Sequence, residues 1–129
     1  MTCMISDSTI QAIRKFTVER NWERFHTPVN LAKSISIEAA ELLECYQWTP
    51  EAPEADAERV QEELADVVTY CIMMADALDV DLDDIIKDKL SKTIGKYPAD
   101  VVRDNYDEYE SRHLAARQSN NCKENQESR

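Results

Sequence analysis

Two pairs of acidic residues have the chemistry and the spacing of a metal site. The members of each pair stand three positions apart: Glu38 with Glu41, and Glu63 with Asp66. Residues at this spacing share one face of a helix, and the stretch between the pairs is long enough to end one helix and bring a second back antiparallel. That return would set the two pairs face to face. Ligation by carboxylate oxygens alone favours a hard cation, so Mg²⁺ or Mn²⁺ fits better than zinc.

Glu38 gives the strongest indication of such a site. On a helical wheel it falls inside an apolar stripe that includes Leu31 and Cys45, where an unpaired carboxylate is costly. Carboxylates roughly 4 Å apart repel by about 4 kcal/mol at an effective dielectric of about 20, and a cation would offset that repulsion. The alternative is that the acids are exposed residues of a chain that is acidic throughout, in which E-x-x-E arises by chance. Geometry alone leaves the two interpretations level.

The elements that would position these acids are helices. One glycine and four prolines disfavour a β-sandwich or barrel, which needs frequent turn residues. We predict four helices: Ser8 to about Arg20, Pro28 to about Gln47 after an N-cap at Thr27, Ala57 to Leu78, and one that 81–84 caps and that ends at Gly95. The acidic pairs lie on the second and third of them. We expect a domain over 1–110, with room for one more short helix after Pro98, and a polar, mobile tail over 111–129.

The third predicted helix is apolar almost all round. One narrow stripe holds Val60, Leu64, Val67, Cys71, Met74 and Leu78, whereas Val68, Tyr70, Ile72 and Met73 lie well off it. The few other helices of a small chain cannot cover every side of such a helix. We therefore expect an all-α, four-helix-bundle-type core completed by oligomerisation, a dimer or tetramer that packs through this helix. The alternative is a monomer with this helix at its centre.

Composition and charge exclude several other classes. A single glycine cannot form a glycine-rich phosphate loop, and the two histidines, His26 and His113, lie in no Glu-x-x-His motif of the kind a di-iron centre needs. The 15 Lys and Arg stand against 26 Asp and Glu, a net charge of −11, which disfavours a nucleic-acid polymer as partner. We expect no membrane span and no signal peptide. The four cysteines are scattered, so we expect reduced thiols and a cytoplasmic protein.

Three segments carry a resemblance to a known family. The stretch FHTPVNLAKSISIEAAELLECYQW from Phe25 to Trp48 resembles the MazG-like, all-α nucleoside triphosphate pyrophosphohydrolases, in particular their dCTP pyrophosphatase branch. Residues 61–82 and 89–98 are similar to the third helix and the closing segment of that family. The whole superfamily shares E-x-x-E and E-x-x-D, whereas the FHxPxNL, QW and KYP elements are more specific.

The resemblance implies an activity and a metal. The activity is cleavage of a nucleoside triphosphate between its α and β phosphates, on dCTP or a related pyrimidine deoxynucleotide, which would cleanse the nucleotide pool. The residues implied to bind Mg²⁺, with Mn²⁺ as a possible substitute, are Glu38, Glu41, Glu63 and Asp66. Glu38 or Glu41 would act as the general base. Alternatives are hydrolysis of dUTP or phosphoribosyl-ATP by the same superfamily, or a non-catalytic acidic helical module that binds a protein partner.

The resemblance also implies a set of substrate-binding residues. Trp22 and Trp48 would form aromatic walls for the base, with His26 and Asn30 as polar contacts nearby. At the end of the fourth helix, three more would lie near the nucleotide: Lys89, Thr93 and Tyr97. Thr93 stands where the family usually has an asparagine, so its contacts depart from the family pattern.

Overall fold

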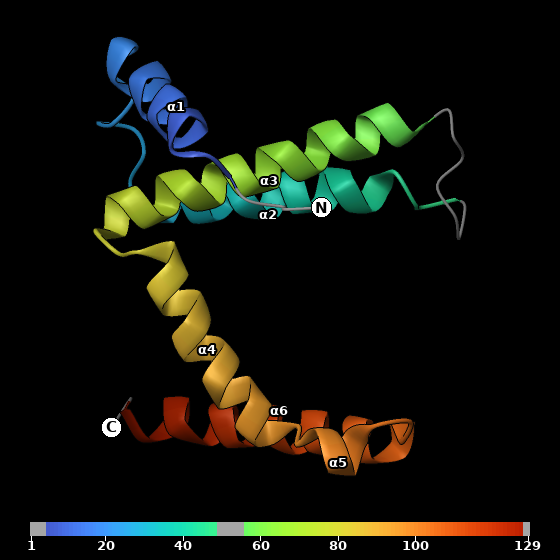
Figure 1. Ribbon diagram of the computed structural model, residues 1–129. Coiled ribbons are helices and arrows are strands. Elements are labelled where there is room, and N and C mark those ends of the chain that lie inside the picture. Colours follow the sequence, from blue (N-terminus) through green and yellow to red (C-terminus); the bar gives the residue numbers. More distant parts are fainter. Residues whose placement is uncertain (1–4, 49–55, 128–129) are drawn as a thin grey trace. The chain divides into compact units, whose positions relative to one another are not determined.

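The computed structural model describes residues 5–48 and 56–127, and all its regular elements there are helices (Figure 1). The helices are α1 (Asp7–Glu19), α2 (Pro28–Glu44), α3 (Ala57–Leu78), α4 (Leu82–Lys96), α5 (Ala99–Val102) and α6 (Tyr106–Glu127). The expected all-α class is confirmed. None of the described helices combines the length and the apolar character that crossing a bilayer requires. The chain forms two compact units, residues 1–82 and 83–129.

Helices α2 and α3 lie side by side and antiparallel in the first unit (Figure 1). The predicted start of α2 is confirmed, because Thr27 is the N-cap, its hydroxyl accepts a hydrogen bond from the Asn30 amide at 3.3 Å, and Pro28 occupies the first turn. Helix α3 has the predicted bounds, and it ends where Asp79 adopts a left-handed conformation with φ of 53°. The return predicted from the chain length between the acidic pairs is therefore present.

Three helix ends differ from those predicted. Helix α2 ends at Glu44 instead of near Gln47. Helix α1 starts one residue before Ser8, because Ser6 is the N-cap that accepts from the Thr9 amide. Helix α4 runs through Gly95 to Lys96, and Gly95 does not have the positive φ of a helix-ending glycine. The chain leaves the helix only on approaching Pro98, which restricts the residue before it to extended conformations.

Helix α6 occupies most of the segment for which the sequence predicted a tail. Asn105 starts it, since the Asn105 side chain accepts a hydrogen bond from the Glu108 amide at 3.1 Å, and an ion pair of 2.7 Å joins Glu108 to Arg112 one turn later. The predicted domain end at residue 110 falls inside this helix, whereas the two compact units meet between residues 82 and 83. The mobility of 111–129 stays a prediction.

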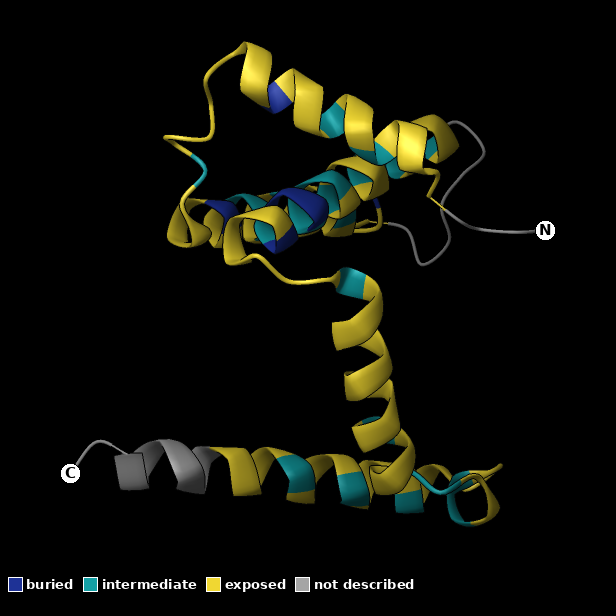
Figure 2. Ribbon diagram, turned by 60° about the vertical axis from the view of Figure 1, so that its left-hand side comes forward, coloured by how far each residue is buried: buried dark blue, intermediate teal, exposed yellow. Residues whose placement is uncertain are grey.

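Apart from Thr17 on α1, the buried residues among those described belong to α2, its C-cap Cys45 and α3; Figure 2 colours the ribbon by burial. The predicted stripe of α2 is confirmed, with Leu31 and Cys45 buried and Glu38 half-buried between them. On α3 the prediction was partly wrong. Ile72 and Met73 are buried, although they were expected off the stripe, whereas Leu64 and Leu78 are 50% and 49% exposed, because α3 turns the Ile72–Met73 side toward its neighbours.

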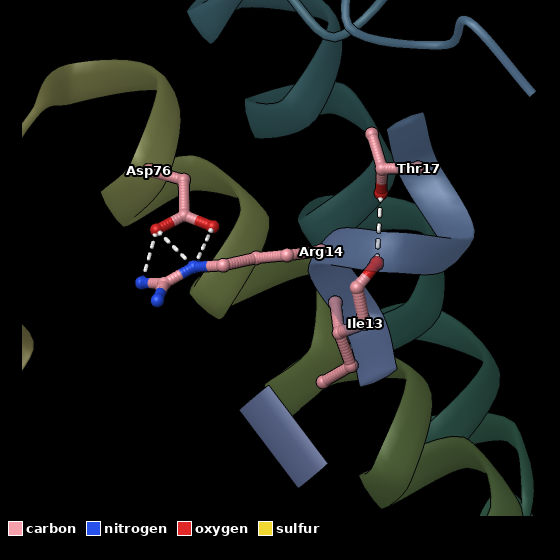
Figure 3. Close-up of polar contacts among 4 residues, drawn as sticks. All are labelled: Ile13, Arg14, Thr17 and Asp76. Atoms are coloured by element: carbon pink, nitrogen blue, oxygen red, sulfur yellow. Dashed lines mark hydrogen bonds and ion pairs between the residues drawn. The ribbon is translucent and has the colours of Figure 1, made fainter. Parts of the chain in front are cut away.

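An ion pair joins α1 to α3, and a hydrogen bond within α1 satisfies its buried threonine (Figure 3). The Arg14 guanidinium grips the Asp76 carboxylate: Nη2 donates to Oδ1 at 2.7 Å, and Nε donates to Oδ2 at 3.0 Å. On the same helix the buried Thr17 hydroxyl donates to the Ile13 carbonyl at 3.2 Å, which satisfies it within α1. The bidentate contact holds α1 across α3 and so sets the position of the turn that follows α1.

Candidate metal centre and its adjoining cavity

Three acidic side chains converge between α2 and α3. Glu38 and Glu41 come from α2 and Glu63 from α3, and one carboxylate oxygen of each lies within 4.8 Å of the others. Glu38 and Glu63 are half-buried, whereas Glu41 is exposed to solvent. The antiparallel pairing of the helices thus brings together three of the four acids singled out in the sequence.

The electrostatics of the cluster show that these negative charges are crowded. Burial raises the pKa of Glu38 above its ordinary value. The negative charges of three neighbours raise it further: Glu41, Asp66 and Glu63. Asp66 therefore acts on Glu38 electrostatically, although it is not one of the three acids whose oxygens lie within 4.8 Å of one another.

Arg59 is a member of this neighbourhood that the sequence reasoning missed. Its Nε donates to Glu63 at 3.4 Å, and its Nη2 donates to Glu44, at the end of α2, at 3.5 Å. The sequence does indicate this contact, because Arg59 and Glu63 stand four residues apart on α3, which is the spacing of a helical ion pair. Arg59 thus joins Glu63 of the acidic cluster to Glu44 at the end of α2.

The donor set fits a hard divalent cation. Three carboxylates supply only oxygen ligands, which is the preference of Mg²⁺ and Mn²⁺. A Glu38 carboxyl whose pKa is raised by its neighbours gains most from a positive charge placed among them. The residues that would hold such an ion are Glu38, Glu41 and Glu63, with Asp66 beside them.

A cavity of about 430 Å³ adjoins this cluster through Asp66. Its lining also includes Trp22 and His26 from the turn after α1, and Tyr70, one helical turn beyond Asp66 on α3. The Trp22 ring meets the His26 ring edge-on, with centroids 6.0 Å apart. The His26 Nδ1 atom is buried and finds no hydrogen-bond partner in the part of the chain that the structure describes. Trp22 and His26, the residues implied to bind the base, thus line one cavity with Asp66. Tyr70 also lines this cavity and was not predicted from the sequence.

The other two candidates near α2 lie outside this cavity. The Asn30 side chain donates to the Phe25 carbonyl at 3.0 Å and so fastens the turn that carries His26. Trp48 is 86% exposed and lines a hollow of about 220 Å³ with Arg59, beyond the end of α2. Trp22 lines the cavity of about 430 Å³ and Trp48 the hollow of about 220 Å³, so neither of these two spaces is lined by both rings.

The remaining candidates lie along α4 and its end, in the second unit. The Thr93 hydroxyl donates to the Lys89 carbonyl at 3.0 Å, and the Tyr97 amide donates to the Thr93 carbonyl at 3.0 Å. Lys89, Thr93 and Tyr97 follow one another at four-residue intervals and so share one face of the helix. Their contact with a nucleotide stays a prediction.

Comparison with known proteins places the chain in a family. The model of the MazG-like family matches residues 33–111, which is more than half of the chain and includes both acidic pairs. The chain belongs to the MazG-like family. The resemblance noted in its sequence, including that to the dCTP pyrophosphatase branch, is confirmed by relatives of that name.

Two of these relatives and one solved structure illustrate the similarity. The MazG-like chain is 35% identical over 109 residues to dCTP pyrophosphatase 1 from Bos taurus, covering 76% of this chain and 64% of that protein. It is 33% identical over 114 residues to dCTP pyrophosphatase 1 from Homo sapiens, covering 80% and 67%. The chain thus spans about two thirds of the length of these relatives. A crystal structure of a pyrophosphatase from Archaeoglobus fulgidus has 38% identity and a TM-score of 0.63, covering 76% of this chain and 98% of that one.

The pKa of Glu38 leads to a prediction about stability without metal. A carboxyl whose pKa is raised by folding binds its proton more tightly in the folded state. Its contribution to stability is fully present below the unfolded pKa, about 4.3 for Glu, and is lost as pH rises through the folded pKa. The melting temperature of chelator-treated wild type should therefore fall further below that of Glu38→Gln as pH rises from about 5 to about 7. A difference that does not change with pH would contradict the crowding at Glu38.

Proposed function

We propose that this protein is a divalent-metal-dependent nucleoside triphosphate pyrophosphohydrolase with dCTP as its preferred substrate. The observation that carries the proposal is the convergence of Glu38, Glu41 and Glu63 beside a cavity that shares Asp66 with their electrostatic neighbourhood. The reaction is hydrolysis of the bond between the α and β phosphates, giving a monophosphate and pyrophosphate. Relatives named dCTP pyrophosphatase 1 support the choice of substrate.

The acids would serve as ligands and as a base. Glu38, Glu41 and Glu63 would hold Mg²⁺, which would neutralise phosphate oxygens and activate a water molecule. Glu38, half-buried among the other acids, is the first candidate for the general base. Glu41 is the alternative base. Arg59 keeps Glu63 in place through their hydrogen bond.

The cavity would receive the base and sugar of the nucleotide. Its volume of about 430 Å³ is within the range of about 300–1,000 Å³ typical of small-molecule sites. Trp22 offers an aromatic face for stacking, and the His26 side chain, which lines the same cavity, is the polar contact proposed beside it. Stacking holds any base, so the preference for cytosine is supported by the relatives rather than by the aromatic wall. Lys89, Thr93 and Tyr97 of the second unit are proposed as further nucleotide-binding residues, as the family resemblance implies.

The exposed apolar side chains of α3 support assembly into a homo-oligomer. Leu64, Val68 and Leu78 are all more than one-third exposed, and water-exposed apolar surface of this kind favours association. A dimer or tetramer through α3 would cover them, and a second copy would also be able to supply Trp48 to the cavity, which Trp48 of the same chain does not line. We place the protein in the cytoplasm, where its thiols, of which Cys45 and Cys71 are free, would remain reduced.

A nucleotide panel tests the function directly. The full chain is incubated with each of the common ribo- and deoxynucleoside triphosphates and with phosphoribosyl-ATP, with and without Mg²⁺, and the products are separated by chromatography. We expect dCTP to give dCMP and pyrophosphate, and no product without a divalent cation. Faster hydrolysis of dUTP or phosphoribosyl-ATP would change the substrate but keep the reaction class. No turnover of any nucleotide would overturn the proposal and favour a non-catalytic acidic module.

A further inference from the structure

Two adjacent residues of α6 hold two adjacent residues at the end of α4. The Arg112 guanidinium donates to the Lys96 carbonyl at 3.2 Å, and the Tyr97 hydroxyl is hydrogen-bonded to Nδ1 of His113 at 3.3 Å. The first contact satisfies a backbone acceptor that the end of α4 leaves without a helical partner. The second contact binds the side chain of the next residue, Tyr97. The end of α4 is thus fixed to α6 at both its backbone and its aromatic side chain.

Aromatic contacts hold the Tyr97 ring from a second direction. The Tyr109 ring lies between the other two rings, with its centroid 5.5 Å from that of Tyr97 and 6.0 Å from that of His113. The Tyr109 and His113 rings are stacked at 27° to each other. Glu108 in turn binds the Arg112 guanidinium at 2.7 Å. Each group that holds Tyr97 is itself held, which is the arrangement that fixes a functional side chain in one orientation.

The hydrogen bond determines which way the Tyr97 hydroxyl points. In the imidazole tautomer that carries its proton on Nε2, Nδ1 is an acceptor, and the tyrosine hydroxyl donates to it. The phenol oxygen then keeps lone pairs available to a donor on a bound molecule. Without the imidazole, the hydroxyl rotates freely about its bond, and the ring loses one of its two supports. A ligand that uses this oxygen would have to order it on binding, at a cost in affinity.

We propose that His113 is a positioning residue that orients Tyr97 for nucleotide binding, with Tyr109 and Arg112 as its supports. The inference rests on the proposed function, in which Tyr97 contacts the nucleotide. The MazG-like family match ends at residue 111, so His113 lies outside the segment that the family defines. It is therefore a residue through which this chain sets the affinity of its site independently of the acids.

Substitutions at both ends of the hydrogen bond test the inference in the full chain. His113→Leu is expected to raise the KM for dCTP about five-fold, the size of one hydrogen bond lost, with kcat changed less than two-fold. Tyr97→Phe should raise KM to the same extent, and the double variant should raise it no further, because the two changes remove one interaction. His113→Asn, whose amide can still bond the hydroxyl, should retain the wild-type KM. Arg117→Leu, one turn along α6, is the matched control and should also retain it.

The outcomes separate this inference from the proposed function. A wild-type KM in His113→Leu, or effects of His113→Leu and Tyr97→Phe that add, would overturn the role of His113 while hydrolysis by the wild type leaves the function standing. Absence of hydrolysis by the wild type would overturn both. If His113→Leu loses helical circular dichroism, His113→Asn and Tyr97→Phe are compared instead. A wild-type KM in His113→Asn together with a raised KM in Tyr97→Phe supports the inference. Equal rises of KM in both variants overturn it.

Discussion

Glutamine in place of Glu38 is expected to abolish nucleotide hydrolysis without weakening the fold. The change removes a proposed metal ligand and the proposed proton acceptor. Loss of a positioned general base alone costs on the order of 10²–10⁴-fold in rate, and we expect a loss of roughly 10³-fold or more in kcat. The shape of the side chain is kept, and crowding by Glu41, Asp66 and Glu63 is relieved. The melting temperature of the metal-free protein should therefore be unchanged or higher at neutral pH.

Pyrophosphate release and thermal unfolding measure the two halves of this prediction. Glu62→Gln is the matched control: it makes the same chemical change on α3, beside Glu63, at an exposed position outside the cluster, and it should turn over at the wild-type rate. Mg²⁺ should raise the melting temperature of the wild type and of Glu62→Gln, but much less that of Glu38→Gln. Wild-type turnover in Glu38→Gln would remove Glu38 from the catalytic centre.

Removal of the Trp22 ring should weaken substrate binding more than it slows chemistry. Stacking of a base on an aromatic side chain is worth about 1–3 kcal/mol, and each 1.4 kcal/mol is tenfold in affinity, so Trp22→Ala should raise KM for dCTP by about 5- to 100-fold. Because the base is held equally in the ground state and the transition state, kcat should change much less. Steady-state kinetics across a range of dCTP concentrations would measure both constants.

Phe25→Ala provides the control for this change. Phe25 lies in the same turn and is 53% exposed, but it does not line the cavity, so its loss should leave KM nearly unchanged. A change in kcat alone for Trp22→Ala would contradict the role of the ring as a wall for the base. A rise in KM for Trp48→Ala, at the far end of α2, would indicate that a second copy completes the site.

The sequence predicted best the features that depend on neighbouring residues. Thr27 and Pro28 start α2 by local interactions alone, as its N-cap and its first-turn proline. The bounds of α3 follow from its own run of apolar residues. The start of α1 was less determined, since both Ser6 and Ser8 can cap and only packing selects one. Helix α6 was missed because polar composition was taken as a sign of a tail, whereas the ion pair of Glu108 and Arg112 supports a helix.

Only the part of the candidate site that depends on spacing within two helices was predicted from the sequence. The approach of Glu38 and Glu41 to Glu63 follows from two amphipathic helices returning antiparallel, which spacing reveals. Trp22 and His26 line one cavity with Asp66 because of the way α1 packs against α3. That packing involves residues that are far apart in the chain, such as the ion pair of Arg14 and Asp76. No local pattern encodes such a contact. For the same reason the sequence could not show that Trp48 lies away from Trp22.

The small interior of the chain affects how the protein behaves on dilution. Among the described residues only five apolar side chains are buried: Leu31, Cys45, Ile72, Met73 and Ala75. Small domains bury a low fraction of their surface and are only marginally stable on that account. When association supplies the missing burial, folding and assembly become one equilibrium, and the unfolding midpoint shifts with protomer concentration. For the proposed oligomer, melting temperatures of variants are therefore comparable only at matched protein concentration, and a substitution on the exposed side of α3 would destabilise the fold without touching the acids.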